Sequence, residues 1–77
     1  MVTLYSKDAC PQCNFTKMIL NSKNVTFEEI NIDRDQEAKD YLVNNGFMSL
    51  PVVTRDGHEP ISGNNPGKLN EMITDLI

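Results

Sequence analysis

Residues 2–13, VTLYSKDACPQC, carry the pattern that decides the fold of this chain. The apolar run Val2–Tyr5 predicts a strand, and a short loop leads from it into a helix. Cys10 stands where the N-cap of that helix is expected, and Pro11 takes the first helical position, where its missing N–H is not needed. Cys13 follows one helical turn later, so the two sulfur atoms can meet. A strand followed by a C-x-x-C that opens a helix is typical of thiol–disulfide exchange.

Two other interpretations of this pair remain open from the residues alone: a structural disulfide and a metal site. Cys10 and Cys13 are the only cysteines among the 77 residues. A bridge across so short a loop removes little entropy from the unfolded chain, which argues against a structural staple. Zinc prefers about four ligands, and a lone C-x-x-C supplies only two of them. The only histidine, His58, falls in a predicted turn. The residues therefore favour a redox-active disulfide with no bound cofactor.

The two cysteines are expected to have different roles. Free N–H groups and the dipole of the helix N-terminus favour a thiolate at Cys10, so we expect it to attack and to be more acidic than a free cysteine. Lys7 favours the same charge, whereas the carboxylate of Asp8 opposes it. Cys13 lies inside the first turn and is expected to be less exposed. It would resolve the mixed disulfide that Cys10 forms.

Composition and charge narrow the classes of partner. The formal net charge is -4 and no Lys/Arg cluster is present, which disfavours a nucleic-acid partner. No apolar run approaches the ~20 residues that span a bilayer, and no basic stretch with an apolar run resembles a signal peptide. We therefore expect one domain, residues 1–77, in the cytoplasm and without a membrane partner. In that compartment a disulfide is usually transient and catalytic.

Periodicity extends the prediction through the middle of the chain. In the first helix, the large apolar residues Phe15, Met18 and Ile19 are expected to form the buried face, and the helix should end near residues 23–24. A second strand is expected at Phe27–Ile32. A second helix should then begin with a capping box, bury one apolar stripe and stop at Asn45-Gly46. The capping box is Asp33 with Gln36, and the stripe is Ala38, Tyr41 and Leu42.

The last third predicts a β-hairpin followed by a helix. Strands are expected at Pro51–Thr54 and Glu59–Ser62, joined by an Asp56-Gly57 turn, and Pro60 places the fourth strand at a sheet edge. Asn65 and Pro66 suit the N-cap and first position of a third helix. Its buried residues are expected to be Leu69, Met72, Ile73, Leu76 and Ile77. The resulting order, β-α-β-α-β-β-α, predicts an α/β sandwich with a right-handed parallel βαβ unit and helices on both sheet faces.

With these motifs in view, the chain resembles the NrdH-redoxins, glutaredoxin-like members of the thioredoxin-fold superfamily. The resemblance spans almost the whole chain and implies a thioredoxin fold with a four-stranded mixed sheet and three helices. Its matching pieces are Tyr5-Ser6-Lys7, Cys10-x-Gln12-Cys13, Asn31-Ile32-Asp33-Arg34, Glu37-Ala38, Gly46-Phe47, Leu50-Pro51-Val52-Val53 and Ser62-Gly63-x-x-Pro66.

The resemblance also implies how a substrate is held. Cys10 would be the attacking thiol and Cys13 the resolving one. Pro51 would be a cis-proline facing the cysteines, although a Pro that merely begins a strand is the simpler interpretation of the residue alone. Leu50 would offer its backbone to an extended substrate segment. The remaining substrate-binding positions would be Lys7, Pro11, Gln12, Ser62 and Gly63.

Members of this family pass electrons from NADPH through thioredoxin reductase to class Ib ribonucleotide reductase. The resemblance therefore implies a monomeric protein-disulfide reductase, with thioredoxin reductase as donor and the ribonucleotide reductase large subunit as acceptor. This chain departs from the family at Ile61–Pro66, where the usual Trp, Phe and Arg are missing. Those residues would help to recognise the partners.

Two alternatives to this function are kept. One is a glutathione-dependent glutaredoxin that reduces protein disulfides in general. Gly63-Asn64-Asn65 offers neither the Gly-Gly pair nor the carboxylate that usually meets glutathione, and Gln12 replaces a common Tyr, although Lys7 could hold a carboxylate. The other is an iron–sulfur or metal-binding module. Finally, Phe47 and Met48 either form an apolar docking surface beside the site or, for Phe47, pack into the core.

Overall fold

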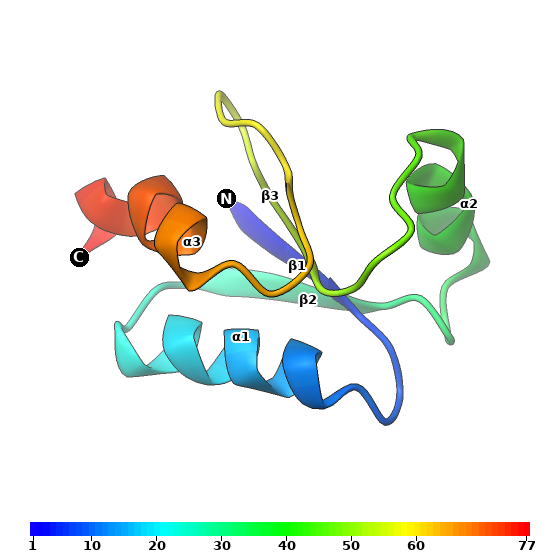
Figure 1. Ribbon diagram of the computed structural model, residues 1–77, viewed down its shortest axis with the longest axis horizontal. Coiled ribbons are helices and arrows are strands. Elements are labelled where there is room, and N and C mark those ends of the chain that lie inside the picture. The colour runs from blue at the N-terminus through cyan, green and yellow to red at the C-terminus, as the bar shows by residue number, and fades with distance from the viewer.

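The predicted strand at the N-terminus forms β1 (Val2–Ser6) and leads through a short loop into α1 (Pro11–Ser22) in this computed structural model, which describes all 77 residues. The order β-α-β-α-β-β-α is as the sequence predicts, and the chain has a thioredoxin-like fold (Figure 1). The remaining elements are β2 (Phe27–Asn31), α2 (Gln36–Asn44), β3 (Val52–Arg55), β4 (Ile61–Ser62), α3 (Pro66–Ile73) and a final 3-10 turn, Thr74–Leu76.

The four strands form one mixed sheet in the order β2-β1-β3-β4. β1 pairs in parallel with β2, where Leu4 faces Glu29, and antiparallel with β3, where Leu4 faces Val53. The parallel pair joined by α1 confirms the predicted βαβ unit. β4 is shorter than predicted and lies at the sheet edge. Pro60 lies just before it, where its missing N–H interrupts no ladder.

Alternation along β1 directs its side chains to both faces of the sheet. Leu4 points to the face covered by α1 and α3, where the main core is Val2, Leu4, Leu20, Val25, Val53, Ile61, Leu69, Met72 and Ile73. Tyr5 points to the other face, and its ring stacks on that of Tyr41 in α2, with centroids 5.8 Å apart. Helices therefore cover both faces, as predicted, and α2 and α3 lie at opposite sides of the molecule in Figure 1.

The predicted buried face of α1 is wrong. The side chains of Phe15 and Met18 are 44% and 67% exposed, Ile19 is half-buried, and the buried residues are instead Cys13, Thr16 and Leu20. Helical geometry explains the difference, because Phe15 and Met18 lie roughly 200° and 140° around the helix from Cys13. Since Cys13 faces the core, both apolar side chains are turned toward solvent.

The start of α2 also differs from the prediction. Its N-cap is Asp35 and not Asp33. The Asp35 Oδ1 accepts a hydrogen bond from the Ala38 N–H at 3.1 Å. Asp33 instead accepts from the Asp8 N–H at 2.9 Å, which ties it to the loop before α1. Ala38 and Leu42 are buried as predicted, but Tyr41, whose ring stacks on that of Tyr5, is 43% exposed.

The predicted N-cap and first residue of α3 are confirmed, but the predicted burial of the residues at its C-terminal end is wrong. The Asn65 side chain accepts from the Lys68 N–H at 3.1 Å, and Pro66 takes the first turn. Leu76 and Ile77 were expected in the core, but they are 43% and 69% exposed. The α-helix ends at Ile73, and the 3-10 turn that follows shifts the angular spacing of the last side chains.

An ion pair holds this C-terminal turn to the sheet. Arg55, at the end of β3, donates to both carboxylate oxygens of Asp75, at 2.6 and 2.8 Å, and to the carbonyl oxygen of Met72. The hydrogen bonds from Arg55 lower the pKa of the Asp75 carboxyl to about 2.

Replacing Asp75 with asparagine is expected to make the melting temperature of the protein less sensitive to acid. The folded-state pKa lies below the unfolded value, so the pair stabilises the fold above about pH 4. That contribution is lost as the pH falls toward about 2. Melting temperatures measured between about pH 6 and pH 2 should show a smaller acid-induced fall for Asp75→Asn than for the wild type. Glu71→Gln, on α3 just before the turn that carries Asp75 and without an ion pair, is the control and should follow the wild type.

Candidate redox site

The turn between β1 and α1 places the two cysteines together. Cys10 caps α1 with extended backbone, and its sulfur accepts a hydrogen bond from the Cys13 N–H at 3.1 Å. The structure contains the Cys10–Cys13 disulfide. Cys10 is 7% exposed and Cys13 only 1%. Their positions are those predicted, and Cys10 is the more exposed of the two.

A groove of about 490 Å³ opens over Cys10. It brings together four residues predicted from sequence, Lys7, Pro11, Gln12 and Leu50, with two that were not, Ala9 and Ser49. Ala9 directly precedes Cys10 and Ser49 directly precedes Leu50. Their position next to predicted site residues was the only sequence signal that could have identified them. Lys7 is the only charged residue lining the groove and makes no ion pair.

The segment that forms the opposite wall of the groove contains a cis peptide bond between Leu50 and Pro51, as predicted. Ser62 and Gly63 do not line the groove. They lie behind this segment, where the Ser62 hydroxyl donates to the Ser49 carbonyl at 3.2 Å and the Gly63 N–H donates to the Pro51 carbonyl at 2.8 Å. Gly63 has a φ of 80°, a conformation that favours glycine. Both residues therefore support the wall of the groove.

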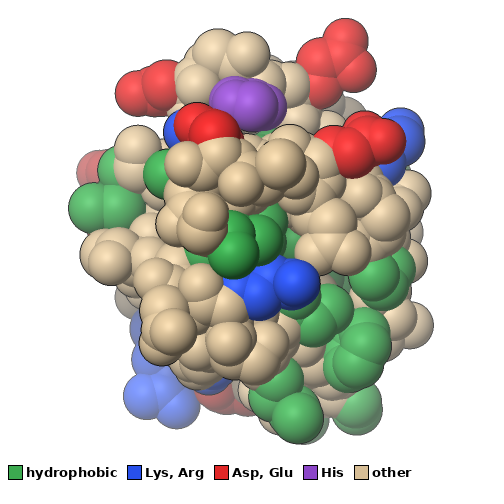
Figure 2. Space-filling view, turned by 90° about the vertical axis from the view of Figure 1, so that its left-hand side faces the viewer, with side chains coloured by type: hydrophobic (Ala, Val, Ile, Leu, Met, Phe, Trp, Pro, Cys, Tyr) green, Lys and Arg blue, Asp and Glu red, His purple; other side chains and the backbone are tan.

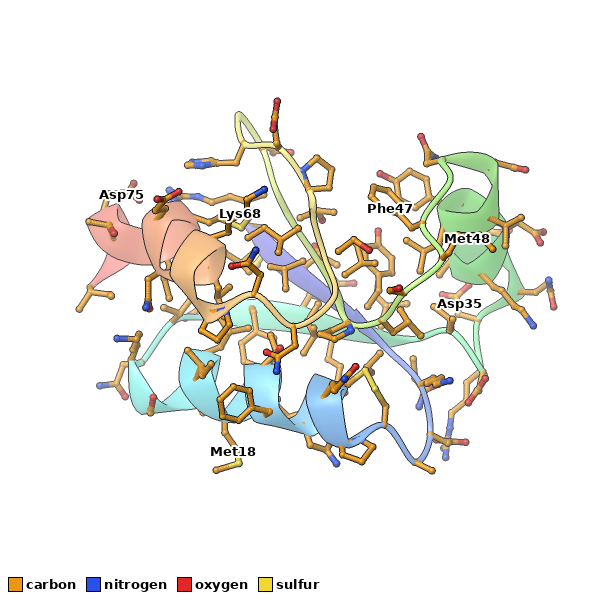
Figure 3. All side chains as sticks on the ribbon, viewed as in Figure 1. Met18, Asp35, Phe47, Met48, Lys68 and Asp75 are labelled. Carbon is orange, nitrogen blue, oxygen red and sulfur yellow. A yellow bond between two sulfur atoms is a disulfide. The ribbon has the colours of Figure 1, made fainter.

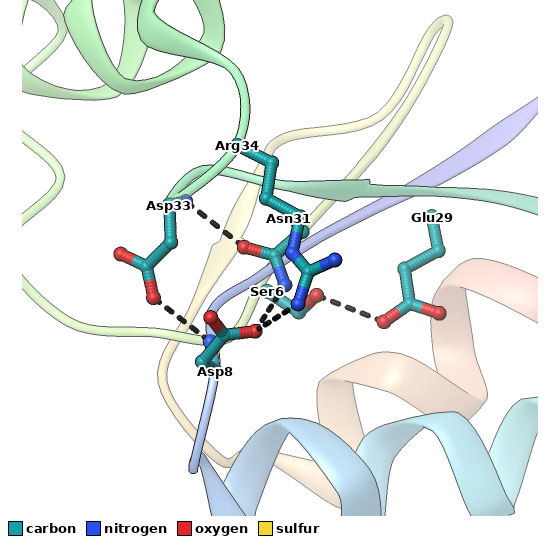
Figure 4. Close-up of polar contacts among 6 residues, drawn as sticks. All are labelled: Ser6, Asp8, Glu29, Asn31, Asp33 and Arg34. Carbon is teal, nitrogen blue, oxygen red and sulfur yellow. Dashed lines mark hydrogen bonds and ion pairs between the residues drawn. The ribbon is translucent and has the colours of Figure 1, made fainter.

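Asp8 was expected to oppose a thiolate at Cys10, but its charge is partnered. Its carboxylate accepts from the Asn31 amide at 2.9 Å and from the Arg34 guanidinium at 3.3 Å (Figure 4). These contacts, first the hydrogen bond from Asn31 and then the charge of Arg34, lower the pKa of the Asp8 carboxyl. The charge of the Arg34 cation opposes the repulsion that Asp8 would exert on a neighbouring thiolate.

A second polar cluster lies between α1 and the sheet and was missed from sequence. The Lys17 ammonium lies 2.9 Å from one oxygen of Glu29, and the buried Ser6 hydroxyl donates to the other at 2.9 Å. Partial burial raises the pKa of Glu29, but the hydrogen bonds from Lys17 and Ser6 outweigh it and the pKa is lowered. Lys17 stands one turn after Cys13, so this cluster fixes α1 against β2 beside Cys13.

Phe47 and Met48 differ in how far their side chains are exposed. The Met48 side chain is 90% exposed on the loop after α2, whereas Phe47 is half-buried and its N–H donates to the Leu42 carbonyl at 2.9 Å (Figure 3). Met48 directly precedes Ser49 and Leu50, which line the groove. An exposed apolar side chain therefore adjoins, along the chain, the segment that lines the groove.

Other functional groups lie away from the cysteines. His58 lies on the β3–β4 turn among acidic side chains (Figure 2), whereas Cys10 lies at the start of α1. No three His, Cys, Asp or Glu side chains are grouped so that they could hold a metal ion. None of the helices has the length and apolar character needed to cross a membrane.

Comparison with known proteins agrees with this site. The family model "Glutaredoxin" matches residues 2–59. The glutaredoxin-like protein NrdH of Lactococcus lactis subsp. lactis is 39% identical over 72 residues, which cover 94% of this chain and 99% of that protein.

Solved structures lead to the same family. The structure of the glutaredoxin-like protein NrdH-redoxin from Escherichia coli is 38% identical and superposes with a TM-score of 0.86 over 92% of each chain. A glutaredoxin from Archaeoglobus fulgidus is 35% identical, with a TM-score of 0.77 over 94% of this chain and 84% of that one. With its C-x-x-C disulfide, this chain belongs to the glutaredoxin family and is an NrdH-like thiol–disulfide redoxin.

Proposed function

We propose that this chain is a monomeric, cytoplasmic dithiol electron carrier that takes electrons from NADPH through thioredoxin reductase and delivers them to class Ib ribonucleotide reductase. The observation that carries the proposal is the asymmetry of the cysteine pair: Cys10 lies under an open groove at a helix N-cap, and Cys13 is buried behind it. The E. coli relative is described as a glutaredoxin-like protein with a thioredoxin-like activity profile, which supports the choice of donor.

The reaction transfers two electrons in two exchange steps. The Cys10 thiolate attacks one sulfur of the partner's disulfide, a mixed disulfide forms, and the partner's other sulfur leaves as a thiolate. The Cys13 thiolate then attacks the Cys10 sulfur, which closes the Cys10–Cys13 disulfide and releases the second partner thiolate. Both partner thiolates take up protons. The donor dithiol regenerates the pair by the same steps in reverse.

The wall of the groove opposite α1 suits a partner segment in extended conformation. Leu50 lines the groove next to the cis bond at Pro51, and backbone groups at such a position can pair with an added strand. Ser62 and Gly63 hold this wall from behind. In this proposal Leu50 and Pro51 orient the partner's disulfide toward Cys10, while Lys7, Pro11 and Gln12 contact the flanking residues.

Two observations bear on the choice between donors. Asn65 uses its side-chain oxygen to cap α3, so it is engaged and offers no charge to the amino group of glutathione. Lys7, in contrast, lines the groove without an ion pair and suits a glutathione carboxylate, which makes a glutathione-dependent glutaredoxin the second candidate. Because the carboxylate partner for the glutathione amine is missing, we favour thioredoxin reductase.

A coupled NADPH-oxidation assay separates the two donors. The same disulfide substrate is supplied with thioredoxin reductase in one reaction and with glutathione and glutathione reductase in the other. We expect turnover with thioredoxin reductase and little above the protein-free rate with glutathione. Turnover with glutathione alone would contradict the proposed donor and establish the second candidate. Addition of a class Ib ribonucleotide reductase and its substrate then tests the acceptor.

A further inference from the structure

We propose that the exposed apolar residues of α1 form a docking surface for the protein whose disulfide reacts with Cys10. This surface, called the α1 stripe, consists of Pro11, Phe15 and Met18. It meets an uncharged, apolar part of the partner beside the partner's disulfide. The inference deepens the proposed function and rests on it, because it requires protein disulfides to dock at Cys10.

The α1 stripe is continuous with the redox groove. Positions i, i+4 and i+7 share one side of a helix, so Pro11, Phe15 and Met18 follow one another along α1. Pro11 also lines the groove over Cys10. Figure 3 shows Met18 on the side of α1 that faces away from the sheet. A partner that places its disulfide on Cys10 therefore has the stripe directly beside it.

The charge distribution around the stripe favours an apolar partner surface. Lys17 is the only charged residue of α1, and its ammonium is paired with Glu29 between the helix and the sheet. No unpaired charge of α1 itself would have to lose its water when a partner covers the stripe. Burying the phenyl ring of Phe15 and the thioether of Met18 is instead favourable, because apolar surface leaves water.

The size of the stripe favours a transient partner over a second copy of the chain. α1 has 12 residues and is about 18 Å long. Three side chains along such a helix fall well short of the about 800 Å² per partner found in stable complexes. Weak redox encounters use smaller interfaces, and the groove adds its own area to the stripe. The occupant is therefore the redox partner itself.

Single-turnover kinetics with two disulfides of different size test the inference. The reduced protein is mixed with insulin, as a protein disulfide, or with bis(2-hydroxyethyl) disulfide, which is too small to cover the stripe. Samples are quenched by alkylation, and free thiols are counted by mass spectrometry. The variants are Phe15→Gln, Met18→Gln and both together. Val43→Gln is the matched control, because Val43 is a 61% exposed apolar residue on α2.

We expect the double variant to react with insulin about tenfold more slowly, which is the size of effect typical of interface anchors. Its rate with the small disulfide should stay within about twofold of wild type, and Val43→Gln should match wild type with both. Met18→Gln alone, at a largely exposed position, should show a smaller loss in the same direction and guards against misfolding of the Phe15 variants.

Two results would overturn the inference. An unchanged insulin rate in the double variant would show that the stripe does not contact the partner. An equal loss with both disulfides would show that the side chains act on the fold or on the cysteines. Failure of the protein-disulfide reductase activity on which the inference rests has a different signature, since wild-type protein would then reduce neither disulfide. Failure of the proposed donor would appear only in the coupled NADPH-oxidation assay.

Discussion

Replacing Cys10 with serine is expected to abolish protein-disulfide reduction, with a loss of at least roughly 10³-fold in rate. The serine hydroxyl does not ionise near neutral pH, so it cannot attack a disulfide as the thiolate does. Cys13 cannot take over the attack, because it is 1% exposed behind the helix N-terminus. The measurement is reduction of insulin, with dithiothreitol as electron donor, against the protein-free rate.

Serine at this position should leave the fold intact. Serine is a good N-cap, and its oxygen can accept the Cys13 N–H in place of the Cys10 sulfur. The thermal unfolding temperature of Cys10→Ser should therefore lie close to that of the reduced wild-type protein. A folded Cys10→Ser variant that still accelerates disulfide reduction would contradict the assignment of Cys10 as the attacking residue.

Replacing Cys13 with serine is expected to trap the mixed disulfide between Cys10 and the partner. The first exchange step remains possible, but no thiolate follows to release the partner. The product should accumulate nearly in proportion to the protein added and should be visible by non-reducing electrophoresis and mass spectrometry. Dithiothreitol should release it.

The matched control for trapping is the double variant Cys10→Ser/Cys13→Ser, which should form no adduct. If Cys13→Ser forms no adduct and still turns over a protein substrate, the resolving role assigned to Cys13 is wrong. If it turns over only with glutathione, glutathione is replacing the second thiol, and the glutathione-dependent candidate gains support.

The parts of the fold that follow from local chemistry were predictable from sequence. The helix starts at Pro11 and Pro66 were found because a missing N–H is harmless only in the first turn. The turn at Gly57 and the helix stop at Gly46 were found because both need a positive φ, observed at 80° and 77°. The redox site was found for a similar reason, since Cys10 and Cys13 are neighbours on one helical turn.

The errors arise where tertiary packing decides the outcome. Helical spacing of apolar residues assigned Phe15 and Met18 to the core, but the side of α1 that faces the sheet instead carries Cys13 and Leu20. The contact between Ser6 and Glu29 spans 23 residues and depends on the register of β1 with β2. Sequence periodicity carries no information on that register.

In the redox site, too, the features that depend on tertiary structure could not be predicted from the residues alone. The cis bond before Pro51 was expected only through family resemblance, because X–Pro bonds in general are mostly trans. The supporting role of Ser62 and Gly63 became visible only when β4 was placed behind residues 49–51.

The most direct test of the account is the site at which the fully reduced protein is alkylated. A sub-stoichiometric amount of iodoacetamide is added at pH 7, and peptide mapping locates the modified cysteine. The account predicts modification at Cys10, faster than that of glutathione in the same tube, with Cys13 left free. Modification of Cys13, or of both cysteines equally, would contradict the claim that Cys10 is the nucleophile of this redoxin.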